Sequence, residues 1–336
     1  MAAKPLALTM GDPAGCGPQI TASAWQALKT TDTAPFALIA DPATLTGLCP
    51  TEIITDIKDA AHIFTNALPI LSLSQALPHP PVPGHPDAAF APGIIESIEI
   101  ATRLALAGDA SAMITNPISK AVLYSAGFQH PGHTEFLAAQ CSEATKQPIT
   151  PVMMLVGGGL RVALASIHIP LMQVGAYLST EHLVAIGRIT ASALRRDFGI
   201  TAPRLAFTGL NPHAGEEGMI GREEIDIINP AATVLRGEGI QISDARPGDT
   251  VFLEALNDRY DAVIAMTHDQ GLIPVKTLDM WGGVNTTLGL PVIRTSPDHG
   301  TAYEAAKSAG CRPDSLLAAL KLAGDMAENR TRNTHV

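Results

Sequence analysis

Three histidines, His168, His213 and His268, each come shortly after a run of apolar residues. Neutral imidazoles are good ligands for zinc, manganese, iron and cobalt, and three of them leave coordination positions open for substrate or water. If the apolar runs are strands of an open α/β sheet, ligands bind beyond their carboxyl ends. We therefore predict that these histidines converge on one divalent metal ion.

The alternative is that each histidine makes only a local hydrogen bond near a turn. The three lie too far apart in the chain to match any local metal-binding signature, so their spacing supports neither interpretation. For a single histidine the turn interpretation is the more common one. The same placement three times, each among Gly, Pro, Asn or Asp residues, favours the metal site.

Cations also follow apolar residues, at Lys276 and Arg294. Arginine binds phosphate with a planar fork of donors and lysine binds it as a point charge. The formal net charge is −10, so an anionic substrate must be captured by a few local cations rather than by the overall field. We predict phosphate recognition, although solvated surface cations would give the same pattern.

Several familiar catalytic patterns are missing from the sequence. The glycine-rich segment at residues 11–18 fits neither G-x-G-x-x-G nor the P-loop, so it predicts a tight turn at least as well as a phosphate cradle. No G-x-S-x-G or H-E-x-x-H segment occurs, which argues against serine hydrolases and zincin proteases. The sequence also contains no Rossmann fingerprint, so that motif gives no reason to expect a nicotinamide cofactor.

Composition predicts a folded, cytoplasmic α/β protein that binds neither nucleic acid nor membrane. The 336 residues are 46% hydrophobic and 16% charged, enough apolar material for two domains. No basic cluster suits nucleic acid, and Arg195 and Arg196 suggest a helix end, while residues 330–332 suggest a solvated tail. The four cysteines lie far apart and form no C-x-x-C pair, which indicates a reducing compartment. The sequence also has no apolar stretch long enough to predict a membrane span.

Short apolar runs alternate with longer amphipathic stretches, as in parallel sheets covered by helices. We predict helices beginning near Pro18, Pro92, Thr134, Thr180, Glu223 and Thr301, and a hairpin turn at residues 157–161. The expected strands are residues 6–10, 36–40, 112–115, 152–156, 162–167, 205–208, 262–266 and 291–294. An outer domain is expected at residues 1–130 plus 275–336, with a second α/β domain, residues 131–274, inserted in it.

Taken together, these segments resemble the 4-hydroxythreonine-4-phosphate dehydrogenase family of pyridoxal phosphate (vitamin B6) biosynthesis. The matching segments run in family order over nearly the whole chain and include TMGDPAG, TNPISK, LNPHAGE and HDQGL. They lie at residues 9–15, 115–120, 131–137, 168–171, 210–216, 268–272, 284–289 and 293–302. The chain departs from the family pattern at Gln19, at Thr267 and at residues 303–307, which read Tyr-Glu-Ala-Ala-Lys.

The resemblance implies an isocitrate/isopropylmalate dehydrogenase-like fold, with two α/β domains flanking a cleft in a homodimer whose active site lies at the interface. It implies that His168, His213 and His268 bind the metal (zinc, magnesium or cobalt), with one of them contributed by the other subunit. The outer domain would hold NAD or NADP, and the inserted domain the metal ligands and dimer interface. The implied substrate contacts are His133, Thr134, Lys276, Asn285 and Arg294, and the implied cofactor contacts are Asp298, Gly300 and Thr301.

The implied reaction oxidises the C3 hydroxyl of 4-phosphooxy-L-threonine with NAD, and loss of carbon dioxide then gives 3-amino-2-oxopropyl phosphate. Asp269 would orient a metal ligand or accept a proton, and Lys276 would hold an anionic group of the substrate. Three alternatives remain open: a sister dehydrogenase acting on 4-phospho-threonate or 4-phospho-erythronate, a metal-dependent hydrolase, and a non-catalytic protein that binds phosphorylated metabolites.

Overall fold

The chain folds into two compact units. The computed structural model describes residues 4–130, 132–308 and 310–333. Unit 1 comprises Met1–Pro151 and Leu290–Glu328, and unit 2 comprises Val152–Gly289 and Asn329–Val336. The boundaries expected near residues 130 and 275 therefore fall inside unit 1 and unit 2, respectively. Pro131, part of the segment at residues 131–137, lies outside the described residues.

Unit 1 is built on a parallel sheet of short strands, whose central members are mostly apolar. In spatial order the strands are β3 (Thr51–Ile54), β4 (Leu68–Leu71), β2 (Phe36–Ile39), β1 (Leu6–Thr9), β5 (Met113–Ile114) and β12 (Arg294–Pro297). All of these pairings are parallel. Every residue of β1 and β2 is buried, as expected for central strands covered on both faces.

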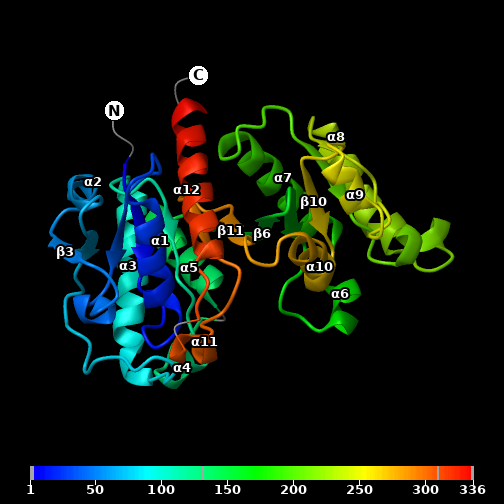
Figure 1. Ribbon diagram of the computed structural model, residues 1–336. Helices are drawn as coiled ribbons and strands as arrows, with labels where there is room; N and C mark the ends of the chain where they lie inside the picture. Colours follow the sequence, from blue (N-terminus) through cyan, green and yellow to red (C-terminus); the bar gives the residue numbers. More distant parts are fainter. Residues whose placement is uncertain (1–3, 131, 309, 334–336) are drawn as a thin grey trace. The chain divides into compact units, whose positions relative to one another are not determined.

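Helices surround this sheet, and α1 and α3 run alongside its strands in Figure 1. Pro18 and Pro92 stand in the first turns of α1 and α3, so both predicted starts are confirmed. The helices of unit 1 are α1 (Gly17–Leu28), α2 (Ala60–Ile63), α3 (Ala91–Ala107), α4 (Lys120–Ser125), α5 (His133–Thr145), α11 (Tyr303–Lys307) and most of α12 (Asp314–Asn333).

Unit 2 has a mixed sheet. Its strands, in spatial order, are β11 (Val284–Leu288), β6 (Val152–Gly157), β7 (Leu160–Leu164), β10 (Ala262–Ala265), β8 (Arg204–Phe207) and β9 (Gln241–Ile242). The first three are antiparallel and the rest are parallel. Gly158 (φ 59°) and Gly159 (φ 85°) form the turn between β6 and β7, which confirms the predicted hairpin.

The helices of unit 2 lie on this sheet and carry much of its core. They are α6 (Leu171–Tyr177), α7 (Thr180–Arg196), α8 (Asn229–Gly237), α9 (Val251–Leu256) and α10 (His268–Leu278), with irregular helical turns at Pro212–Gly218 and Glu224–Ile228. Leu183 on α7, Leu235 on α8 and Phe207 on β8 all belong to one buried cluster. None of the helices in the described residues is long and apolar enough to span a membrane.

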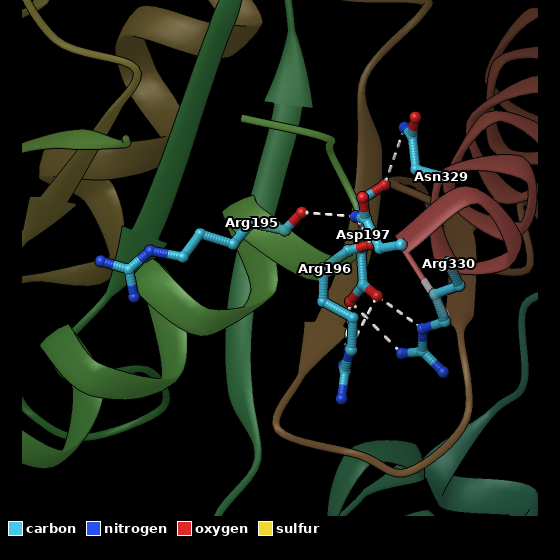
Figure 2. A network of polar contacts seen from close by, with 6 residues as sticks. Arg195, Arg196, Asp197, Asn329 and Arg330 are labelled. Carbon is cyan, nitrogen blue, oxygen red and sulfur yellow. Dashed lines mark hydrogen bonds and ion pairs between the residues drawn. The ribbon is translucent and has the colours of Figure 1, made fainter. Parts of the chain in front are cut away.

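A buried carboxylate ties the end of α12 to the end of α7 within unit 2 (Figure 2). Asp197, 1% exposed, accepts hydrogen bonds from both Arg196 and Arg330. Asn329 donates to the carbonyl oxygen of Asp197, and Asn333 donates to that of Arg195. Arg195 and Arg196 end α7 as predicted. The prediction of a solvated tail is wrong for Arg330, because its guanidinium is held by a carboxylate distant in sequence.

Burial by itself would raise the pKa of Asp197. Its hydrogen bonds to Arg196 and Arg330, together with their charges, outweigh that effect and hold the pKa below its usual value. The carboxylate is therefore ionised near neutral pH and acts as a structural anchor for the last turn of the chain's final helix.

Candidate active site

The site in unit 1 begins at a buried arginine. Arg294 opens β12, opposite Met113 of β5, and is only 3% exposed. Its Nε and Nη2 donate to Thr115 Oγ1 at 3.1 and 2.8 Å. The predicted strand at residues 291–294 is wrong in its bounds, because Arg294 starts the observed strand, which continues to Pro297. Thr115, which follows β5 directly, was not among the predicted site residues.

Arg294 remains a cation despite its burial. Desolvation lowers the pKa of Arg294 to about 10, and the negative charge of Glu135 acts in the opposite direction. At neutral pH the guanidinium is therefore charged in surroundings that offer it little water. A buried charge of this kind is stabilised by nearby negative charge, and an anionic group of a ligand beside Arg294 would add to the effect of Glu135.

His133 faces the same place from the first turn of α5. Its Nε2 is buried and has no hydrogen-bond partner within the described part of the chain. Burial, together with the positive charge of Arg294, holds the pKa of His133 well below its ordinary value, so the ring is neutral. Leaving a buried polar atom unpaired costs about 1–3 kcal/mol, which favours a site that is completed by a ligand. Thr134, the next residue, is half-buried.

Gly132 makes room between two charged side chains of the same region. A Cβ at this position would lie 3.0 Å from Glu135 Oε2 and 3.5 Å from Lys120 Nζ. Lys120 and Glu135 therefore flank the start of α5, beside His133. The sequence signal for Lys120 was its place just after the strand ending at Thr115, in the segment TNPISK.

The predicted cofactor loop, residues 298–302, also belongs to unit 1 and packs on the glycine-rich turn. Cys16 N–H donates to the carbonyl oxygen of Thr301 at 2.8 Å. A Cβ on Gly15 would lie 2.8 Å from that oxygen, so the turn needs glycine for this close approach. Asp298 N–H donates to Ser315 Oγ at 3.0 Å, and Gly300 is exposed.

Unit 2 brings two of the three predicted metal ligands together. The rings of His168 and His268 have centroids 5.6 Å apart and an interplanar angle of 42°. His168 lies beyond the end of β7, and His268 begins α10 just beyond β10, as the strand-end argument predicts. Asp269 Oδ1 lies 2.8 Å from His268 Nδ1. When His268 donates from Nδ1, its Nε2 is left as the atom available to a metal.

His213 lies in an unusual left-handed turn. Residues 213–217 all have positive φ, from 45° to 81°, and only one of the five is glycine. Left-handed backbone costs an L-residue about 1–2 kcal/mol, so surrounding contacts must hold this turn. Asn211 provides them: its N–H donates to Glu224 Oε1 at 2.8 Å, and its Nδ2 donates to Glu223 and Glu224 at 2.7 and 2.9 Å. His213 itself is exposed.

Among the residues that the structure describes, the three predicted histidines do not come together within one chain. No group of three His, Cys, Asp or Glu side chains suited to a metal ion occurs among the residues described. Chemically, His168 and His268 suit zinc or cobalt as a pair of imidazole ligands. The other predicted residues of unit 2, Lys276 on α10 and Asn285 on β11, are both half-buried, and Asn285 Oδ1 is buried without a partner in the described residues.

Comparison with known proteins shows where the chain belongs. The family described as "Pyridoxal phosphate biosynthetic protein PdxA" matches residues 31–323. A 4-hydroxythreonine-4-phosphate dehydrogenase from Caulobacter vibrioides is 50% identical over 334 residues, covering 98% of this chain and 99% of the relative. The enzyme of the same name from Maricaulis maris is 50% identical over 336 residues, covering 97% of this chain and 98% of the relative.

A solved structure agrees with these relatives. The crystal structure of 4-hydroxythreonine-4-phosphate dehydrogenase from Klebsiella pneumoniae superposes with a TM-score of 0.84 at 35% identity, over 97% of this chain and 100% of that one. The resemblance found in the sequence and the predicted α/β dehydrogenase fold are therefore confirmed. The chain belongs to the PdxA family of pyridoxal phosphate biosynthetic proteins, the 4-hydroxythreonine-4-phosphate dehydrogenases.

Proposed function

We propose that this protein catalyses the NAD-dependent oxidative decarboxylation of 4-phosphooxy-L-threonine to 3-amino-2-oxopropyl phosphate, assisted by a divalent metal ion. The relatives carry the name of this dehydrogenase over the full length of the chain. The observation in the structure that carries the proposal is the buried cation Arg294 beside a neutral His133, whose Nε2 is buried with no hydrogen-bond partner among the described residues. An anionic, hydroxyl-bearing substrate would pair its negative charge with Arg294 and give His133 Nε2 a hydrogen-bond partner.

The charged and the neutral side chains of the proposed substrate site have different roles. Arg294 would pair with an anionic oxygen of the substrate through its planar donor fork, oriented by Thr115. His133, being neutral, can donate to one oxygen or accept from a hydroxyl group without adding charge. In the proposal Thr134 and Asn285 supply further hydrogen bonds, and Lys276 holds a second anionic group and aids proton transfer.

His168 and His268 would hold the metal ion, and His213 would be the third ligand. A bound divalent ion supplies a Lewis acid that lowers the pKa of a coordinated hydroxyl group and stabilises negative charge on oxygen. Asp269 would keep His268 in one tautomer by accepting from Nδ1. An all-imidazole set favours zinc or cobalt over magnesium.

Because one chain pairs only two of the histidines, we propose that a second copy supplies His213 in a homodimer. Large apolar side chains near the histidine pair are exposed to solvent, as expected of a surface that a partner covers. On α6, which follows His168, Leu171 is 73% and Met172 is 93% exposed. On α10, which begins at His268, Ile273 is 63% exposed. Sedimentation equilibrium would give the oligomeric state, and a monomer at assay concentrations would contradict this proposal.

The test of function is a reduction assay with a small panel of substrates. Metal-stripped protein would be supplied with zinc, cobalt or magnesium, NAD or NADP, and either 4-phosphooxy-L-threonine, 4-phospho-threonate or 4-phospho-erythronate. We expect NADH to form with 4-phosphooxy-L-threonine and only when metal is present.

Each competing function predicts a different result in that assay. A higher kcat/KM with a phospho-sugar acid would identify a sister dehydrogenase. Turnover without any dinucleotide would identify a hydrolase, and tight binding without turnover would identify a binding protein.

Location in the cytoplasm stays a prediction from the sequence.

A further inference from the structure

A short hydrogen bond joins two segments of unit 1 whose roles are otherwise separate. Tyr303 begins α11, directly after the loop at residues 298–302, and Asp12 lies in the glycine-rich turn. Tyr303 Oη donates to Asp12 Oδ2 at 2.6 Å. We propose that Tyr303 and Asp12 are positioning residues that fasten this loop to the turn and so raise the affinity for the nicotinamide cofactor. The inference rests on the proposed function, because it takes the loop as a cofactor-binding element.

The carboxylate of Asp12 is buried and therefore needs hydrogen-bond donors such as Tyr303. Its side chain is 1% exposed, and the described residues contain no salt bridge to it. Its other oxygen accepts from the N–H of Ala14 at 3.0 Å. Burial raises the pKa of Asp12, while the hydrogen bonds from Tyr303 and Ala14 lower it. A buried carboxylate without a cation depends on its few hydrogen-bond donors, so losing one is costly.

Tyr303 is suited to be a permanent donor. Burial and the proximity of Asp12 raise the pKa of the Tyr303 phenol to about 12, so it keeps its proton throughout the neutral range. Phenylalanine has nearly the same shape and lacks only the hydroxyl group. Tyr303→Phe therefore removes the hydrogen bond to Asp12, together with the contacts of the hydroxyl group with Ser119 and Thr301, and leaves the packing of the ring in place.

The loop needs fastening because its backbone is strained. Ala302, the residue before Tyr303, has φ 47° and ψ 51°, a left-handed conformation that is unfavourable for an L-residue. Besides Tyr303, the loop region is held by the Cys16 N–H on the oxygen of Thr301 and by Gln19 Nε2, which donates to the oxygen of Ala306 at 2.7 Å. These bonds flank the strained residue on both sides, and the phenol–carboxylate bond lies next to it.

Ordering the loop in advance should favour cofactor binding without altering the chemical step. A loop that is mobile in the free enzyme must lose conformational entropy when it closes on a ligand, and that cost weakens binding. Neither Tyr303 nor Asp12 needs to contact the cofactor for this effect. The expected signature is therefore a change in cofactor affinity, with little change in kcat or in the KM of the phosphorylated substrate.

The experiment compares wild type, Tyr303→Phe and the control Tyr124→Phe, which changes a tyrosine in the same unit that is 47% exposed. NADH binding is titrated by fluorescence on the metal-loaded protein, and hydrogen exchange is followed in peptides covering residues 12–17 and 298–306. We expect Tyr303→Phe to raise the Kd for NADH about tenfold, and to speed exchange in both peptides, with less than a twofold change in kcat. The control should match wild type.

Each result bears on the inference without depending on turnover. Unchanged exchange in Tyr303→Phe would mean that the hydrogen bond does not hold the loop, and the inference would be overturned. Faster exchange with an unchanged Kd for NADH would mean that the hydrogen bond orders the loop but does not affect cofactor affinity, which would also overturn the inference. If wild type binds NADH but reduces no dinucleotide with any substrate of the panel, the proposed function fails while the NADH titration still decides this inference. A wild type that binds neither NADH nor NADPH would refute both.

Discussion

Replacing Arg294 with lysine tests whether the buried guanidinium binds the substrate. Lysine keeps the positive charge but cannot make both of the contacts from Nε and Nη2 to Thr115 Oγ1, at 3.1 and 2.8 Å. It also replaces a planar fork with a single ammonium group. Hydrogen bonds to charged groups contribute about 1.5–3 kcal/mol each, so losing one of the substrate contacts should lower kcat/KM about 10- to 100-fold.

Steady-state NADH formation measures this effect, and inorganic phosphate as a competitive inhibitor reports anion binding separately. Arg294→Lys should raise KM for the phosphorylated substrate and weaken inhibition by phosphate, because retention of charge preserves only part of the attraction. Thr115→Val is the matched control: it removes the hydroxyl group that orients Arg294 and keeps the guanidinium, so we expect less than a tenfold loss. A folded Arg294→Lys variant with wild-type KM and wild-type phosphate inhibition would refute the role of Arg294.

Three further predictions concern stability, the left-handed turn and thiol reactivity. Asp197→Asn should destabilise the protein by about 2 kcal/mol in urea unfolding at pH 7. Because the folded pKa of Asp197 lies below its unfolded value, this difference should start to shrink as the pH falls below about 4 and vanish only below the folded pKa. A difference that does not shrink at all over this acid range would exclude the charge as its source. Gly215→Ala would place a methyl group 2.6 Å from Glu224 Oε2, on a residue whose φ is 81°. This variant should lower Tm and weaken cobalt binding, which absorption spectroscopy measures. The control Gly237→Ala, with open space around the added methyl group, should do neither. Cys16 should resist iodoacetamide at pH 8 in mass spectrometry until urea is added, because burial raises the pKa of its thiol to about 12, and rapid labelling of the folded protein would contradict this.

The elements that the sequence predicted well are those decided by local composition. The strands β1 and β2 are short apolar runs, and Pro18 and Pro92 mark helix starts, so both kinds of signal are present in a few neighbouring residues. The strand β11 was missed because Val-Asn-Thr-Thr-Leu is half polar, and it becomes a strand by pairing antiparallel with β6, more than a hundred residues earlier in the chain. No local pattern contains that pairing.

Helix α10 was missed for a related reason. It contains Gly271 and Pro274, two residues that disfavour helix interiors, yet it forms because Thr267 caps it and Gly271 packs closely on the sheet. A Cβ on Gly271 would lie 2.4 Å from Leu164 Cδ2, so the glycine that weakens the helix locally is the one that lets it lie on β7. Tertiary packing outweighs intrinsic propensity at this position.

In the candidate site, too, the sequence predicted what local patterns contain and missed what tertiary contacts determine. The sequence supplied the types of its side chains, because histidine, lysine and arginine after apolar runs are a local pattern. It could not supply the left-handed turn at His213, since alanine and glutamate both disfavour positive φ. Asn211, just before that turn, is held by Glu223 and Glu224, which lie in a helical segment more than ten residues later in the chain. The turn that carries His213 is therefore supported by the buried carboxylate of Glu224, and substitutions of Glu224 should alter metal binding although Glu224 is no ligand in the proposed site.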